Sequence, residues 1–147
     1  CALRAAGHGL RVAVVQFLKG KWKTGERAAL PRVGVEILPL GGGFIRDTGR
    51  EEASRQARAA LAFCLKRSRE GLDLLVMDEV CVVVSEGLIA AAEVLDLLKD
   101  LPGETDVILT GRGCPAEIQA AADTVTEMRD IAHAHRGGAA ARRGIEW

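Results

Sequence analysis

The sequence lacks several features that would place it in a specialised class of protein. No apolar run approaches the roughly 18 residues that a membrane-spanning helix needs, so no membrane span is predicted. Basic and acidic side chains number 20 each, and the zero net charge argues against non-specific nucleic-acid binding. The four cysteines form no C-x-x-C pair, so we expect neither zinc nor disulfides, and a reducing cytoplasm is the expected compartment. A glycine-rich phosphate loop of the form G-x-x-x-x-G-K-[ST] is also absent from these residues.

What is present is the composition of an ordinary soluble domain. The chain has 147 residues, 48% hydrophobic and 27% charged, which fits one globular domain. Apolar, β-branched runs predict strands at residues 11–18, 35–40, 74–79, 106–110 and 124–131. Apolar residues at helical spacing predict helices at 1–6, 26–30, about 49–68, 86–100 and 115–122. This alternation predicts a single α/β domain over residues 1–147 with a mainly parallel sheet, followed from residue 132 to 147 by a loose tail rich in Gly, Ala and Arg.

The third predicted strand ends in two carboxylates. Leu74-Leu75-Val76-Met77 is followed directly by Asp78-Glu79, and such an apolar run is typical of a strand buried on both faces. Acids at the carboxyl end of such a strand lie where open α/β sheets bind ligands, and in phosphate-handling proteins one of them often helps to hold Mg²⁺. The alternative is a strand that simply meets a polar loop.

Basic residues follow two other predicted strands. Lys19, with Lys21, Lys23 and Arg27, follows the first strand and suits a polyphosphate, although a solvated basic loop is the favoured interpretation of these residues taken alone. Arg112 lies between two glycines after the strand that ends near residue 110, where it suits a phosphate or carboxylate, or simply a tight turn. All these loops follow strand carboxyl ends, so we expect them at one edge of the sheet.

Two further features leave their role open. Phe44 follows three glycines, so it suits either a flat ligand or packing against the core. His133 and His135 are two residues apart near the C-terminus, but metal binding there would need further ligands, and a mobile polar tail is the default interpretation.

Several sequence blocks together resemble one family, the CobA/CobO-type corrinoid adenosyltransferases. The resemblance runs over nearly the whole chain, in matching order and spacing. The blocks are Ala5-Ala6-Gly7-His8-Gly9, Val14-Val15-Gln16-Phe17-Leu18-Lys19-Gly20, Gly25-Glu26-Arg27, Asp78-Glu79, Thr110-Gly111-Arg112-Gly113-Cys114, Ala122-Asp123-Thr124-Val125 and Gly144-Ile145-Glu146.

The resemblance implies a fold and a reaction. The expected fold is a RecA-like, P-loop NTPase-type three-layer sandwich. The protein is expected to work as a homodimer in the cytoplasm, with a flavoprotein-type reductant as a possible partner. The expected reaction transfers the 5′-deoxyadenosyl group of ATP to the Co(I) of a reduced corrinoid (cob(I)alamin), releases triphosphate and needs Mg²⁺. Because Co(I) is itself the nucleophile, no side chain is expected to act as a catalytic base.

The resemblance also implies roles for individual residues. Glu79, with Asp78 beside it, is expected at the Mg²⁺ site, and Phe44 and Arg46 are expected to meet the corrinoid. In the family, the aromatic that Phe44 matches presses on the lower face of the corrin and displaces the lower axial ligand, which makes Co(II) easier to reduce. The residues expected around ATP are Arg4, Lys19, Arg27 and Arg112.

The chain departs from the family pattern at several points. The family's phosphate loop and its strand are expected immediately before residue 1, and without them we expect no turnover. Arg46 replaces a tryptophan, Cys81-Val82 replaces the usual Asn or Thr and Tyr, and Ala132-His133 replaces Lys-His. The chain has no tyrosine and only 3% aromatic residues, so either the lower-ligand mechanism differs or the chain is a diverged homologue. Two alternatives remain: another RecA-like ATPase, or a relative that binds nucleotide or corrinoid without catalysis.

Overall fold

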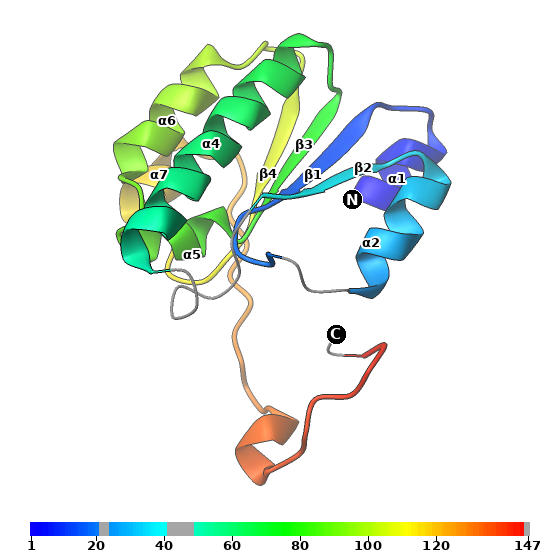
Figure 1. The fold of residues 1–147 in the computed structure, drawn as a ribbon, viewed down its shortest axis with the longest axis vertical. Helices are drawn as coiled ribbons and strands as arrows, with labels where there is room; N and C mark the ends of the chain where they lie inside the picture. The colour runs from blue at the N-terminus through cyan, green and yellow to red at the C-terminus, as the bar shows by residue number, and fades with distance from the viewer. Residues whose placement is uncertain (21–23, 41–48, 146–147) are drawn as a thin grey trace.

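The fold is built on one four-stranded parallel sheet (Figure 1). The computed structural model describes residues 1–20, 24–40 and 49–145. The strand order is β2-β1-β3-β4, and every neighbouring pair is parallel. The strands are β1 (Val12–Gln16), β2 (Glu36–Pro39), β3 (Leu74–Asp78) and β4 (Asp106–Leu109). The predicted α/β class with a parallel sheet is therefore confirmed.

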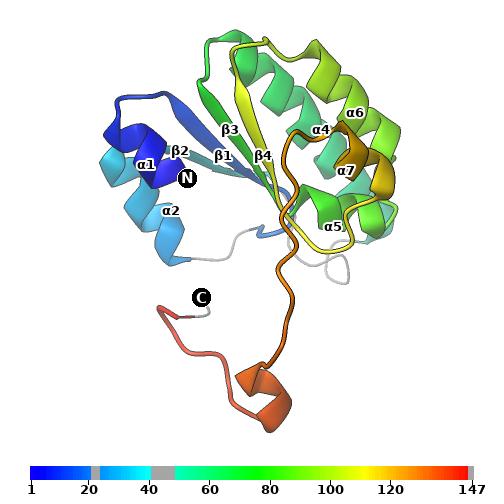
Figure 2. The same ribbon diagram turned by 180° about the vertical axis from the view of Figure 1, so that it is seen from behind.

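Helices cover both faces of the sheet and make three layers. One face carries α4 (Arg50–Arg69), α5 (Val80–Ser85), α6 (Ala91–Asp100) and α7 (Ala116–Ala121) (Figures 1 and 2). The other carries α1 (Ala2–Gly7), α2 (Gly25–Ala29) and the 3₁₀ helix η1 (Leu30–Val33). This arrangement is consistent with the predicted RecA-like three-layer sandwich.

The central strand β1 explains why both layers form. All five of its residues are buried, and successive side chains point to opposite faces. Ala13 and Val15 join the core under α4, α5 and α6, whereas Val12 and Val14 join the smaller core under α1 and η1. An unbroken apolar run, rather than an alternating one, is what a strand covered on both faces requires.

Helix α4 buries one stripe of mostly small residues. Ala53, Ala57, Ala60, Leu61 and Cys64 recur at intervals of three or four and are all buried. The helix predicted up to about residue 68 is therefore present, and it ends at Arg69.

The helix predicted at 86–100 begins later than expected. It starts at Ala91, and the separate helix α5 occupies Val80–Ser85 before it. The sequence of α5 is rich in β-branched valine, which disfavours helix locally. Burial of Val80, Cys81, Val83 and Val84 against the sheet overrides that preference.

The strand predicted at 124–131 is wrong. These residues form no strand, and every described residue from 119 to 145 is exposed. An extended segment becomes a strand only when a neighbour accepts its backbone hydrogen bonds, and no described strand pairs with it. A short 3₁₀ helix, η2 (Ala134–Gly137), is the only regular element described beyond α7, and the loose tail stays a prediction.

Among the helices that the structure describes, none is long and apolar enough to cross a membrane.

Candidate functional site

The carboxyl ends of β1 and β3 bring the predicted basic and acidic residues together. In the parallel ladder Gln16 is the register partner of Asp78, so these two side chains lie on neighbouring strands at the same level. Lys19 follows β1, and Glu26 and Arg27 lie on α2. We call Gln16, Lys19, Glu26, Arg27 and Asp78 the strand-end cluster.

Two donors in this cluster bridge the same two carboxylate oxygens. Nζ of Lys19 lies 3.1 Å from Oε1 of Glu26 and 3.4 Å from Oδ2 of Asp78. Nε2 of Gln16 donates to the same two oxygens at 3.3 Å each. The cluster thus ties the end of β1 to both α2 and the end of β3.

Arg27 completes the cluster through the other side of the glutamine amide. Its Nε donates to Oε1 of Gln16 at 3.0 Å, and its Nη2 donates to the carbonyl of Gly20 at 2.6 Å. Gln16 is only 1% exposed, so a buried amide is satisfied on both its nitrogen and its oxygen. The predicted gathering of Lys19, Arg27 and Asp78 is what the structure has.

The charges in the cluster shift two pKa values. Burial alone would lower the pKa of Lys19, but its hydrogen bond to Glu26 and the charges of Asp78 and Glu26 outweigh this and raise it. Burial alone would raise the pKa of Glu26, but hydrogen bonds from the backbone and from Lys19, with the charge of Lys19, lower it to about 2. Both groups are therefore charged at neutral pH.

Asp78 is held at both of its oxygens. Oγ1 of Thr110 donates to Oδ1 at 2.9 Å, while Oδ2 accepts a hydrogen bond from Nε2 of Gln16 and forms an ion pair with Nζ of Lys19. A carboxylate whose lone pairs are engaged this way is fixed in orientation but has little room for a further ligand.

Glu79 has a different environment. It is the only non-glycine residue of the described chain with positive φ, at 66°, and it begins α5 as its N-cap. Its backbone N–H donates to Oγ1 of Thr110 at 2.9 Å. Within the described residues its carboxylate has no hydrogen-bond or ion-pair partner. Burial and the neighbouring Asp78 raise the pKa of Glu79, against the opposing charges of Lys19 and Arg112.

These residues fit a magnesium ion whose coordination is completed by the phosphate oxygens of a substrate. Mg²⁺ is commonly held by one or two carboxylates, with the remaining positions filled by phosphate oxygens and water. Glu79 offers one half-buried carboxylate that has no hydrogen-bond or ion-pair partner among the described residues. No group of three potential metal-ligating side chains occurs in the described part of the chain, so a cation here would depend on oxygens from its ligand.

The remaining predicted residues fall into three groups. Arg112 is exposed after β4, near enough for its charge to act on Glu79. Arg4 is exposed on α1 and forms no hydrogen bond or ion pair with the described cluster residues, so it is not brought into the cluster. Phe44 and Arg46 lie outside the described residues.

Sequence reasoning assigned no role to Gln16, Glu26 or Thr110. All three stood inside recognised blocks, but their importance depends on contacts between segments distant in sequence. The available signal was Gln16 itself, because an amide at the end of an otherwise apolar buried strand needs polar partners.

His133 and His135, the two histidines of the C-terminal segment, lie next to each other. The rings of His133 and His135 lie edge to face with centroids 6.4 Å apart, and both residues are exposed. The described residues supply no third metal-ligating side chain beside them.

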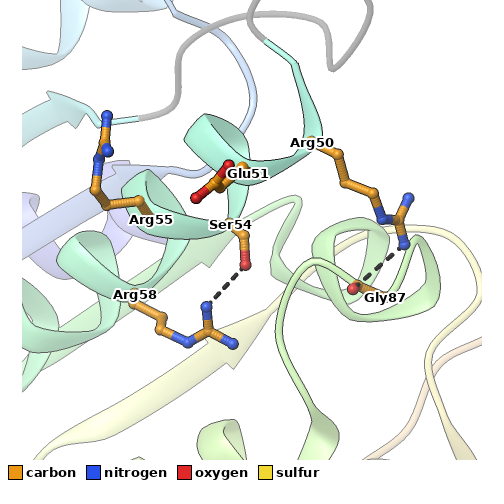
Figure 3. A pocket seen from close by; sticks show the side chains of 6 residues that line it. All are labelled: Arg50, Glu51, Ser54, Arg55, Arg58 and Gly87. Carbon is orange, nitrogen blue, oxygen red and sulfur yellow. Dashed lines mark hydrogen bonds between the residues drawn. The ribbon is translucent and has the colours of Figure 1, made fainter.

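A separate pocket of about 580 Å³ lies beside the start of α4 (Figure 3). Its arginines are already engaged: Arg58 pairs with Glu93 at 2.7 Å, Arg55 pairs with Glu52, and Arg50 donates to backbone carbonyls, including that of Gly87. The pocket therefore presents no unpaired arginine to an anion. The lining residues are Arg50, Glu51, Ser54, Arg55, Arg58 and Gly87.

A parallel sheet covered by helices on both faces makes this an α/β protein, and its acidic and basic side chains gather at the carboxyl edge, where open α/β sheets bind ligands. The family described as ATP:corrinoid adenosyltransferase BtuR/CobO/CobP matches residues 1–147, and the chain belongs to this family. The predicted resemblance and the transferase class are thus confirmed.

Individual relatives agree with this assignment. The chain is 41% identical to corrinoid adenosyltransferase CobA of Salmonella typhimurium over 148 residues, which cover 99% of this chain and 76% of that protein. It is 39% identical to the corrinoid adenosyltransferase of Escherichia coli K12, with the same coverage. It is 36% identical to that of Pseudomonas aeruginosa, over 98% of this chain and 73% of the relative.

Proposed function

We propose that this protein transfers the 5′-deoxyadenosyl group of ATP to the Co(I) of a reduced corrinoid. The Co–C bond forms as the C5′–O bond breaks, and the electron pair of that bond leaves with triphosphate. Family membership supports the reaction, and the observation that carries the site is the Glu79 carboxylate, half-buried and without a described partner beside Lys19 and Arg112.

The two acids have different proposed roles. Glu79 is the carboxylate that would hold Mg²⁺ together with the phosphates of ATP, because no described residue competes for it. Asp78 would instead orient its neighbours, because Thr110, Gln16 and Lys19 already occupy both of its oxygens. When bound, Mg²⁺ would neutralise the negative charge that develops on the leaving triphosphate.

The basic residues at this edge would serve the same leaving group. Lys19, Arg27 and Arg112 are proposed to face the triphosphate, with Arg4 as a further nucleotide contact expected from the resemblance. Since Co(I) is the nucleophile, the protein's task is to align C5′ with cobalt and to stabilise negative charge.

Several finer points come from the family alone and stay proposals. Phe44 and Arg46 are proposed to meet the corrinoid. A homodimer, a cytoplasmic location and a flavoprotein-type reductant are proposed as the setting of the reaction.

The direct test uses the protein expressed from its complete gene, with ATP, Mg²⁺ and chemically reduced cobalamin. A light-sensitive product with a Co–C bond, formed together with triphosphate, is the expected result. Release of orthophosphate without that product would replace the proposal with ATP hydrolysis. Binding of both substrates without any product would make the protein a non-catalytic relative.

A further inference from the structure

Thr110, the residue that follows β4, is hydrogen-bonded to the whole turn between β3 and α5. Its N–H donates to the carbonyl of Met77 at 3.2 Å, and its carbonyl accepts from the N–H of Cys81 at 3.1 Å. Its hydroxyl donates to Oδ1 of Asp78 at 2.9 Å and accepts from the N–H of Glu79 at 2.9 Å. The end of β4 is therefore hydrogen-bonded to Met77, Asp78, Glu79 and Cys81, which lead from the end of β3 into α5.

The hydroxyl is the part of this arrangement that a strand ladder does not provide. Its proton is committed to Asp78, which leaves an oxygen lone pair for Glu79. Glu79 has the left-handed conformation, which costs free energy in a residue with a Cβ atom, so something must hold it there. The bond from its N–H to Thr110 is a contact that does so.

The loop that follows Thr110 packs closely against α5. A Cβ atom on Gly111 would lie 2.9 Å from the backbone nitrogen of Val82, and one on Gly113 would lie 2.8 Å from Cβ of Ser85. The chain leaving β4 thus rests directly on α5.

We propose that Thr110 is a positioning residue for the cation and nucleotide site, acting through its hydroxyl on Glu79 and Asp78. This inference rests on the proposed function, because it takes Glu79 as the carboxylate that meets the cation. Without the hydroxyl, the Glu79 N–H and one Asp78 oxygen lose their partner, and Glu79 can leave the conformation that presents its carboxylate. We expect this change to leave corrinoid binding unaltered.

The test compares Thr110→Val, which keeps the shape but removes the hydroxyl, with Thr110→Ser, which keeps the hydroxyl. Thr105→Val is the matched control, since Thr105 precedes the same strand and its hydroxyl donates to the carbonyl of Leu72 at 3.0 Å, at the opposite end of β4. Binding of Mn²⁺ with ATP is measured by electron paramagnetic resonance, and KM is measured separately for ATP and for the corrinoid.

We expect Thr110→Val to weaken Mn²⁺–ATP binding about tenfold or more, as loss of a partner for part-buried polar groups implies. Thr110→Ser should stay within about threefold of the wild type, Thr105→Val should bind as the wild type does, and KM for the corrinoid should not move in any variant. Wild-type binding by Thr110→Val would overturn the inference, as would an equal loss in Thr110→Ser.

A second measurement needs no variant and covers a failure of Thr110→Val to fold. Amide hydrogen exchange of the wild-type protein should protect the Glu79 N–H as strongly as the Cys81 N–H, and rapid exchange at Glu79 would overturn the inference. A wild-type protein that binds Mn²⁺–ATP but forms no Co–C product would sink the proposed function and leave the role of Thr110 intact. Wild-type rates of transfer by Thr110→Val at ATP concentrations well below the wild-type KM would overturn the role of Thr110 and leave the proposed function intact.

Discussion

The ammonium nitrogen of Lys19 lies 3.1 Å from Oε1 of Glu26, which joins the loop after β1 to the first turn of α2. Both side chains are about one-third exposed, at 34% and 36%, so solvent screens the pair. The contact is therefore more important for placing Lys19 at the sheet edge than for the stability of the fold.

Glu26→Gln should destabilise the protein in a manner that depends on pH. The pKa of Glu26 is lowered from 4.5 to about 2 in the fold, so its stabilising effect is complete above pH 4.5 and is lost as the pH falls towards 2. At neutral pH we expect a loss of less than about 1 kcal/mol in the free energy of unfolding. Denaturant unfolding across this pH range measures it, with the exposed Glu104→Gln as control. A difference that does not change with pH would contradict this account.

Glu79→Gln should lose activity and gain stability. Burial and the charge of Asp78 raise the pKa of Glu79, so its ionised form disfavours the folded state at neutral pH, and removing the charge should raise the melting temperature. The gain should shrink as the pH falls through the raised pKa, where the wild-type group becomes neutral. Adenosyl transfer should fall more than about 100-fold, beyond the range typical of residues that only orient a metal ligand. Near-normal transfer would refute the role of Glu79.

Gln16→Leu should be among the more damaging single changes at this edge. The amide is 1% exposed and bonds Asp78, Glu26 and Arg27, so an apolar replacement leaves these groups without a partner. We expect a loss of about 1–3 kcal/mol in the free energy of unfolding and weaker ATP binding. Gln119→Leu is the control, because this exposed side chain donates to a single carbonyl, that of Cys114. Equal effects of the two substitutions would argue against the strand-end cluster as a unit.

The sequence was sufficient for the sheet but not for the contacts at its edge. Runs such as Val12–Gln16 and Leu74–Asp78 are strands because apolar, β-branched residues between two helical layers have few alternatives. Helix α5 escaped prediction because its valines favour strand locally, and only burial against the sheet makes them helical. The segment at 124–131 has the pattern of a strand but no described neighbour to pair with, which a pattern cannot reveal.

The site was predicted in part for the same reason. Lys19, Arg27 and Asp78 could be placed at one edge because parallel strands all end there. The role of Glu26 depends on its contact with Lys19, 7 positions away in the chain, and that of Thr110 on its contact with Asp78, 32 positions away. Residue type and spacing do not encode which oxygen meets which donor, and this information comes only from the packed fold.

Arg46→Trp tests the proposed corrinoid contact, which lies outside the described residues. Restoring the aromatic expected from the family resemblance should speed reduction of the Co(II) substrate, because a bulky apolar group favours loss of the lower axial ligand. The rate of Co(II) reduction with ATP bound is the measurement. Arg69→Trp, a change at the exposed end of α4, is the control. No difference between the two variants would mean that residue 46 does not meet the corrin.

The strand-end cluster, taken with Glu79 and Arg112, contains as many cationic as anionic groups. The opposite charges of these six groups largely cancel at long range, so together they contribute little steering of a charged nucleotide and little ionic-strength dependence to its association rate. Discrimination at this edge then arises after contact, from the directions in which fixed donors and acceptors point. The groups concerned are Lys19, Arg27 and Arg112 on one side and Glu26, Asp78 and Glu79 on the other.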